Sequence, residues 1–225
     1  MTDNANPGLW TAVDEYLNEV LVGSDESLEQ ALAHSTESGL PAIAVSPTQG
    51  KFMMMLARVQ GARRILEIGT LGAYSTIWFA KALPADGRII TIESEPKHAE
   101  VARENIEAAG FGEMVDVRLG KALDVLPDIA AENVGPFDLT FIDADKPNIP
   151  EYFDWALRLS RSGSIIIVDN VIREGAVIDA NSEDASVQGV RRLNDRLARE
   201  SSVTVTTLQT VGGKGYDGFT IALVN

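Results

Sequence analysis

Residues 64–75, with the sequence RILEIGTLGAYS, combine a short apolar run with a glycine-containing turn and the start of a helix. The aliphatic residues of 64–69 predict a buried strand. Gly69 and Gly72 allow the chain to turn sharply and to lie close to a ligand before a helix begins near Ser75. A strand, a tight turn and a helix in this order predict the first unit of an open α/β sheet.

The same alternation continues along the chain. Four further apolar, β-branched runs predict strands at 88–93, 115–120, 137–143 and 164–170. Stretches of helical spacing separate the strands at 75–83, 96–109, 122–131 and 150–159. Each interval is long enough for a crossover helix, which parallel neighbours require. The pattern therefore predicts a mostly parallel sheet with helices on both faces.

The two ends of the chain depart from this rhythm. The strand-like runs 203–209 and 219–224 are separated only by the glycine-rich stretch 210–218, which is too short for a crossover helix, so an antiparallel hairpin is expected. Before the first strand, 9–22, 26–37 and 48–60 predict helices. We find no repeat and no long linker, and expect one domain over 1–225, with 1–60 as a helical cover and 61–225 as the core.

Composition excludes several classes of function. The 33 acidic residues outnumber the 19 lysines and arginines, and the net charge of −14 disfavours nucleic acids and anionic membranes as partners. Without cysteine there is no disulfide framework, thiolate zinc site or cysteine nucleophile. No apolar run approaches the ~20 residues that span a bilayer. Residues 1–4 lack the basic region of a signal peptide, so we expect a cytoplasmic protein.

The strand ends predict where a cofactor binds, because ligands of open α/β sheets bind outside the carboxyl ends of the strands. The turn with Gly69 and Gly72 follows the first strand, and Glu93 ends the second, where an acid accepts hydrogen bonds from ribose hydroxyls. Together they indicate an adenosine-bearing ligand. A dinucleotide fingerprint would need glycine at Leu71 and Tyr74. A nicotinamide enzyme or adenosine sensor stays open, as does the reading that the glycines only shape a turn.

A second group of polar residues follows the fourth and fifth predicted strands. Asp143 and Lys146 stand after one strand, and Asp169 and Asn170 after the other. If these strands are parallel neighbours, their side chains converge. Carboxylate and amide oxygens suit Mg²⁺ or Ca²⁺ better than zinc. The alternative is that Asp145 and Lys146 form an exposed turn pair and that Asp169 and Asn170 cap a helix.

Four motifs in order and at suitable spacing carry a resemblance to a known family. They are LEIGT at 66–70, FIDADK at 141–146, VDNV at 168–171 and GYDGF at 215–219. Residues 35–225 resemble the metal-dependent class I O-methyltransferases related to catechol and caffeoyl-coenzyme A O-methyltransferases, especially the bacterial branch. The resemblance implies a seven-stranded Rossmann-like fold, a homodimer, S-adenosylmethionine and a divalent cation such as Mg²⁺.

The resemblance also implies roles for individual residues. Asp143, Asp169 and Asn170 would bind the metal, and Lys146 would be the catalytic base. Glu93 would bind the ribose hydroxyls, and Ser75 the methionine carboxylate. The residues that would contact the cofactor are Val45, Glu67, Gly69, Thr70, Ser75, Glu93, Ala122, Asp143 and Asp145.

The chemistry that the resemblance implies is methyl transfer to a small aromatic vicinal diol. A cation chelated by both oxygens lowers the pKa of one hydroxyl, Lys146 takes the proton, and the phenolate attacks the sulfonium methyl. Family members commonly carry a tryptophan after the Asn170 position, where this chain has Val171, Ile172 and Arg173, so the acceptor stays open. A metal-independent methyltransferase is the alternative. Residues 172–187 form either a lid or a plain surface loop.

Overall fold

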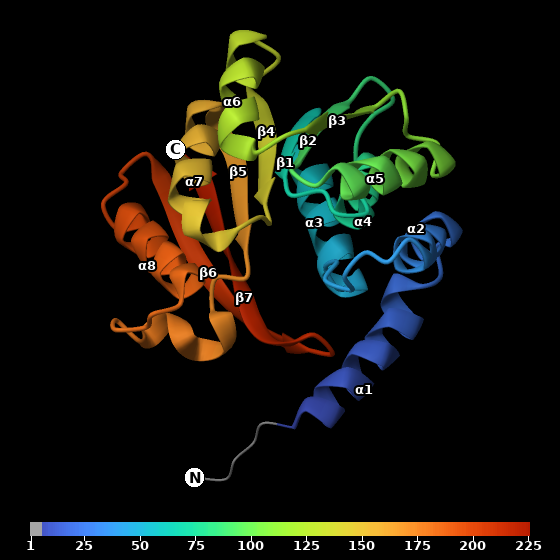
Figure 1. Ribbon diagram of the computed structural model, residues 1–225, viewed down its shortest axis with the longest axis horizontal. Helices are drawn as coiled ribbons and strands as arrows, with labels where there is room; N and C mark the ends of the chain where they lie inside the picture. Colours follow the sequence, from blue (N-terminus) through green and yellow to red (C-terminus); the bar gives the residue numbers. More distant parts are fainter. Residues whose placement is uncertain (1–5) are drawn as a thin grey trace.

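A computed structural model describes residues 6–225 and shows a mostly parallel sheet between two layers of helices (Figure 1). The strand order is β3-β2-β1-β4-β5-β7-β6, in which β7 alone runs opposite to the other six strands. This confirms the predicted class I methyltransferase fold with one reversed strand at the end. The strands are β1 Arg64–Ile68, β2 Arg88–Glu93, β3 Val115–Leu119, β4 Phe137–Ile142, β5 Ser160–Asp169, β6 Val203–Gly212 and β7 Gly215–Val224.

The helices cover both faces of the sheet. Figure 1 shows α6, α7 and α8 on one side of it and α3, α4 and α5 on the other. The helical segments are α1 Pro7–Leu17, η1 Asn18–Val22, α2 Glu26–Glu37, α3 Pro47–Gln60, α4 Tyr74–Ala80, α5 Pro96–Ala108, α6 Ala122–Ala131, η2 Lys146–Asn148, α7 Ile149–Arg158, η3 Arg173–Ile178 and α8 Ala185–Leu197.

The central strands are buried on both faces. In β1 the adjacent residues Ile65 and Leu66 are both fully buried, yet Ile65 belongs to the hydrophobic cluster under α3 and α4, and Leu66 to the cluster under α6 and α7. Successive side chains of a strand point to opposite faces, so a strand covered on both sides needs apolar residues at consecutive positions. This explains the continuous apolar runs of the sequence.

The hairpin is longer than predicted. The prediction of a loop over 210–218 is wrong. Thr210 pairs with Asp217 and Val211 with Tyr216, which leaves only Gly213 and Lys214 in the turn. A Cβ atom at Gly218 would lie 2.2 Å from the carbonyl oxygen of Leu208. Glycine at this position therefore allows the backbones of β6 and β7 to approach closely within the paired strands, and it does not indicate a loop.

The N-terminal helices precede the sheet, and α3 packs against α4 and α2 against α5. Side chains of Asp25 and Ser46 accept hydrogen bonds from the first turns of α2 and α3 and so start these helices. Residues 1–5 of the expected cover lie outside the described residues, and one domain with a cover at 1–60 stays a proposal. Within residues 6–225, no helix has both the length and the apolar character needed to cross a membrane.

Candidate active site

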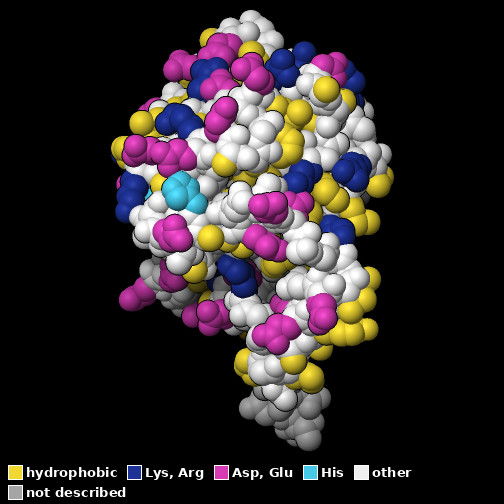
Figure 2. Space-filling view, turned by 90° about the vertical axis from the view of Figure 1, so that its right-hand side faces the viewer, with side chains coloured by type: hydrophobic (Ala, Val, Ile, Leu, Met, Phe, Trp, Pro, Cys, Tyr) yellow, Lys and Arg dark blue, Asp and Glu magenta, His cyan; other side chains and the backbone are white. Residues whose placement is uncertain are grey.

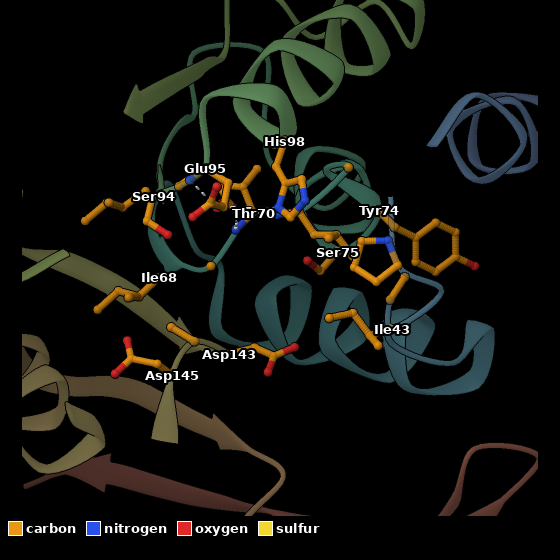
Figure 3. A pocket seen from close by; sticks show the side chains of 18 of the residues that line it. Ile43, Ile68, Thr70, Tyr74, Ser75, Ser94, Glu95, His98, Asp143 and Asp145 are labelled. Carbon is orange, nitrogen blue, oxygen red and sulfur yellow. Dashed lines mark hydrogen bonds and ion pairs between the residues drawn. The ribbon is translucent and has the colours of Figure 1, made fainter. Parts of the chain in front are cut away.

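A cavity of about 1200 Å³ lies at the carboxyl ends of the strands (Figure 3). Figure 3 shows Thr70 after β1, Ser94 and Glu95 after β2, and Asp143 and Asp145 after β4 around this cavity. Two of the predicted residues, Glu67 and Asp169, do not line it. The predicted residues that do are Val45, Gly69, Thr70, Ser75, Glu93, Ala122, Asp143, Asp145, Lys146 and Asn170.

The turn after β1 brings the backbone close to the end of β4. Gly69 has a φ of +99°, and a Cβ atom there would lie 1.9 Å from the carbonyl oxygen of Asp143. Only glycine tolerates both the conformation and the approach. The backbone N–H groups of Thr70 and Leu71 donate to Glu93 Oε2, at 3.2 and 2.8 Å. Glu93 thus stabilises the turn besides lining the cavity, a contact that the sequence did not predict.

Glu67 lies behind the wall of the cavity and is 0% exposed. Its carboxylate accepts hydrogen bonds from Ser75 Oγ at 2.6 Å and Thr91 Oγ1 at 2.7 Å, and from the hydroxyl of Thr76. Burial raises the pKa of Glu67 to about 7, against the opposite effect of these hydroxyl donors. Glu67, one of the predicted cofactor residues, therefore does not face the cavity. It holds the side chain of Ser75, which lines the cavity.

The ends of β4 and β5 bring the two predicted metal-binding carboxylates to one place. Ile142 and Val168 are paired in register, so Asp143 and Asp169 are the next residues of neighbouring parallel strands. Lys146 is only 8% exposed, and its Nζ donates to Asp143 Oδ1 at 2.9 Å. Because Lys146 is buried, the alternative of an exposed turn pair does not describe it.

Asp169 is 5% exposed. Its Oδ2 accepts from Gln49 Nε2 at 2.7 Å, and its Oδ1 from the backbone N–H of Asn170 at 2.9 Å. Burial, with the negative charge of Asp143 as the next cause, raises the pKa of Asp169 to about 7. No α-helix begins at Asp169, because the next segment, η3, starts at Arg173. The helix-cap alternative is therefore not what the structure shows.

This donor set fits a hard divalent cation. Two carboxylates, Asp143 and Asp169, stand at neighbouring strand ends, and Lys146 Nζ forms an ion pair with Asp143 Oδ1 at 2.9 Å. Asn170, at a left-handed φ of 56°, lines the same cavity. In the described part of the chain, no three or more His, Cys, Asp or Glu side chains are grouped to hold a metal. Carboxylate and amide oxygens are the kind of ligand that suits Mg²⁺.

Asp145 belongs to a small polar network at the cavity wall. Its carboxylate accepts from Asn148 Nδ2 at 2.5 Å and from the hydroxyl of Tyr152. Burial and the Asp145 charge raise the pKa of Tyr152 above its usual value, so the tyrosine stays a hydrogen-bond donor. Tyr152 was not predicted as a site residue, although it lies one helical turn beyond Asn148 on a segment that follows the FIDADK motif.

Further residues of the cavity were also missed. His98 lines it, with Nδ1 at 3.7 Å from Glu93 Oε1. Lys214, in the turn between β6 and β7, donates to the carbonyl oxygen of Ala44. Burial lowers the pKa of Lys214, while Asp143 and Asp169 act in the opposite direction. These residues come from different parts of the chain, so no local sequence pattern predicts that they share one cavity.

Known proteins are similar to this chain over nearly its whole length. A family model described as O-methyltransferase matches residues 18–223. The chain is 52% identical over 219 residues to a catechol O-methyltransferase of Niastella koreensis, covering 97% of this chain and 99% of the relative. It is 51% identical over 212 residues to a catechol O-methyltransferase of Mycobacterium tuberculosis, covering 94% of each.

Solved structures are similar over the same span. An O-methyltransferase from Bacillus cereus in complex with SAH has a TM-score of 0.96 and 55% identity, covering 98% of this chain and 100% of that one. The O-methyltransferase TomG from Streptomyces achromogenes, involved in tomaymycin synthesis and solved with SAM, has a TM-score of 0.95 and 52% identity, covering 98% and 99%.

Proposed function

The chain belongs to the O-methyltransferase family and is an S-adenosylmethionine-dependent O-methyltransferase, and from this premise we propose that its acceptor is a small aromatic vicinal diol bound beside a divalent cation. The observation that carries the proposal is the meeting of Asp143 and Asp169 at neighbouring strand ends, with Lys146 Nζ 2.9 Å from Asp143 Oδ1, and with Asp143 and Lys146 in one cavity with the glycine turn. The names of the relatives support a catechol-like acceptor.

The cofactor end of the cavity is formed by the turns after β1, β2 and β3. We propose that Glu93 holds the ribose hydroxyls and that Ser75, oriented by Glu67, holds the methionine carboxylate. Structures of similar proteins contain SAH or SAM. The other proposed cofactor contacts are Val45, Gly69, Thr70, Ala122, Asp143 and Asp145.

Glu67→Gln tests the orienting role. An amide nitrogen cannot accept a hydrogen bond, so at least one of the hydroxyls that now donate to Glu67 must rearrange. We expect affinity for S-adenosylhomocysteine, measured by calorimetry, to fall about tenfold, which corresponds to the ~1–3 kcal/mol cost of a broken buried hydrogen bond. Exposed Glu113→Gln is the control. Unchanged affinity in Glu67→Gln would show that Ser75 is positioned without Glu67.

At the acceptor end, we propose that Asp143, Asp169 and Asn170 hold the cation and that Lys146 accepts the hydroxyl proton. A cation bound there supplies the positive charge that lowers the pKa of a coordinated hydroxyl. Gln49 and the backbone N–H of Asn170 keep the Asp169 carboxylate oriented. Lys146 is held by burial near Asp143, and from there its amine would accept the proton that a chelated diol releases.

Metal removal tests this function. The purified protein should transfer the methyl group of S-adenosylmethionine to catechol in the presence of Mg²⁺, lose at least about 90% of its activity with excess chelator, and regain it when Mg²⁺ is restored. The product is followed by mass spectrometry. If activity with chelator is unchanged, the metal-independent alternative is correct. Regiochemistry follows from the ratio of the two monomethyl ethers made from a substituted catechol.

We also propose that the protein is a homodimer. α1 lies against β6 and has no buried residue, and β6 is an edge strand. Figure 2 shows hydrophobic side chains at the lower end of the face that carries α1. Exposed apolar side chains on α1, η1 and β6 support a second copy as the partner. They are Leu9, Val13, Tyr16, Val20, Leu21, Val205, Leu208 and Val211.

Leu208→Asp tests the dimer. Burying a charge in an apolar contact is costly, so the variant should elute as a monomer when the wild type elutes as a dimer in chromatography coupled to light scattering. Ser162→Asp, at an exposed site off this surface, should leave the mass unchanged. A monomeric wild type at micromolar concentration would contradict the proposal. A cytoplasmic location and the lack of nucleic-acid and membrane partners stay predictions.

A further inference from the structure

Two cationic side chains line the cavity that Asn170 also lines. Arg173 and Lys214 both belong to the lining. None of the ion pairs within residues 6–225 includes either of them. Arg173 Nε is buried and has no hydrogen-bond partner in the described part of the chain. In a protein with a net charge of −14, carboxylates are plentiful, so a buried nitrogen of a cavity-lining arginine that has no partner within residues 6–225 indicates a site for an anion.

The backbone around Arg173 is held in an unfavourable conformation. Arg173 and Glu174 have left-handed φ values of 55° and 56°, which cost side chains of ordinary residues about 1 kcal/mol or more each. Asp217 Oδ1 accepts hydrogen bonds from the backbone N–H groups of Ile172 and Arg173, at 2.9 and 3.1 Å. Asp217 belongs to β7, so this strand holds the backbone of the loop at Arg173, which lines the cavity.

Lys214 comes from the neighbouring segment. A hydrogen bond from Gly213 N to Asp14 Oδ2 at 2.7 Å anchors the hairpin turn that carries Lys214. The Nζ of Lys214 donates to the carbonyl oxygen of Ala44. The loop after Arg173 packs on the same hairpin, since a Cβ atom at Gly175 would lie 3.5 Å from Tyr216 Cε1. Arg173 and Lys214 therefore approach the cavity from two segments that touch each other.

The cavity has room for an acceptor beside the cofactor. Its volume of about 1200 Å³ exceeds the ~300–1,000 Å³ typical of a pocket for one small ligand. Arg173 and Lys214 line the same cavity as Asp143 and Asn170. A diol bound beside Asp143 would therefore share this cavity with both cationic side chains.

We propose that Arg173 and Lys214 select acceptors with an anionic ring substituent, so that the preferred substrates are vicinal diols that carry a carboxylate. Guanidinium groups bind carboxylates through paired N–H donors, and an ammonium adds a point charge. This inference rests on the proposed function and names the class of its acceptor.

The test compares two acceptors that differ in one charge. Protocatechuate carries a ring carboxylate, and methyl protocatechuate carries its neutral ester. We expect the wild type to favour the acid in kcat/KM by at least about tenfold, the value of a charge-assisted hydrogen bond. In Arg173→Gln and Lys214→Gln this ratio should fall by about tenfold, mainly through the KM of the acid. Arg173→Lys, which keeps the charge, should retain most of the preference. Exposed Arg199→Gln is the matched control.

The outcomes separate the possibilities. Equal kcat/KM of the wild type for acid and ester would overturn the proposal. Variants in which kcat/KM falls equally for both acceptors would also overturn it and would indicate a structural role for the substituted residue. A raised KM for S-adenosylmethionine with an unchanged acid-to-ester ratio would mean that these cations bind the cofactor. If neither acceptor nor catechol itself is methylated, the proposed function fails, and this result differs from a mere loss of charge preference. A gain of activity toward cationic dopamine in Arg173→Glu would add support.

Discussion

Lys146→Met is expected to lower kcat by about two to four orders of magnitude, the contribution of a positioned general base. Methionine keeps the apolar stem and approximate volume of the buried side chain, so the main loss is the Nζ atom that lies 2.9 Å from Asp143 Oδ1. Affinity for S-adenosylhomocysteine should stay within about threefold, because the effect concerns only proton transfer from the acceptor. Single-turnover methyl transfer and calorimetry measure the two quantities.

The control for this variant is Lys97→Met, which removes an exposed lysine. If Lys146→Met loses cofactor affinity and turnover in equal measure, the lysine is structural and the proposed base is wrong. Activity of the variant that recovers as pH is raised would agree with loss of a base, since hydroxide ionises the acceptor without the lysine.

Asp169→Asn is expected to weaken Mg²⁺ binding by about 100-fold and, at the same time, to stabilise the metal-free protein. Mutation of groups that hold or orient a metal typically costs ~10–100-fold in affinity, and removal of a charged ligand belongs at the upper end. The second effect follows from the pKa of Asp169, which burial and Asp143 raise from 3.8 to about 7. A buried carboxylate that resists ionisation is a cost to the folded state whenever the pH forces it to ionise.

The raised pKa of Asp169 predicts how the free energy of unfolding changes with pH. Because the folded pKa is raised, the favourable contribution of protonated Asp169 is complete below about pH 4 and is lost as pH rises through about 7. Metal-free Asp169→Asn should therefore exceed the wild type in free energy of unfolding above pH 7, by on the order of 2 kcal/mol. The difference should vanish near pH 4. Urea denaturation at both pH values measures it.

Added Mg²⁺ should reverse the order of stability, since it stabilises the wild type by mass action and the variant much less. Asp128→Asn, at an exposed site of α6, is the matched control and should change neither property. Equal Mg²⁺ titrations of wild type and Asp169→Asn would remove Asp169 from the proposed cation site.

Much of the fold and part of the site could be predicted because their signals are local. Apolar runs and helical spacing mark the alternating elements, and a residue that follows a strand must lie at its end, so Asp143 and Asp169 were expected to converge. The register of Ile142 with Val168 confirms that their strands are neighbours. The hairpin was misjudged at 210–218, since glycine is common both in loops and where two backbones approach closely.

Contacts between distant parts of the chain were beyond the sequence. Gln49 reaches Asp169 across 120 residues, and Lys214 reaches Ala44 across 170. Neither pair shares a motif, because its geometry depends on how α3 and the hairpin pack on the sheet. The same holds for Glu67, whose motif predicts a cofactor contact but whose burial makes it a support for Ser75.

The sequence by itself determined the order of strands and helices along the chain, the strand ends where chemistry gathers and the kinds of donor atoms there, since each of these depends on residues close together in the chain. The tertiary structure alone decided which side chains face the cavity and which stand behind its wall. It also decided the charges that surround them. Burial and electrostatic coupling arise from packing between remote segments, and they raise the pKa of Asp169. The same packing leaves Arg173 Nε without a hydrogen-bond partner among residues 6–225.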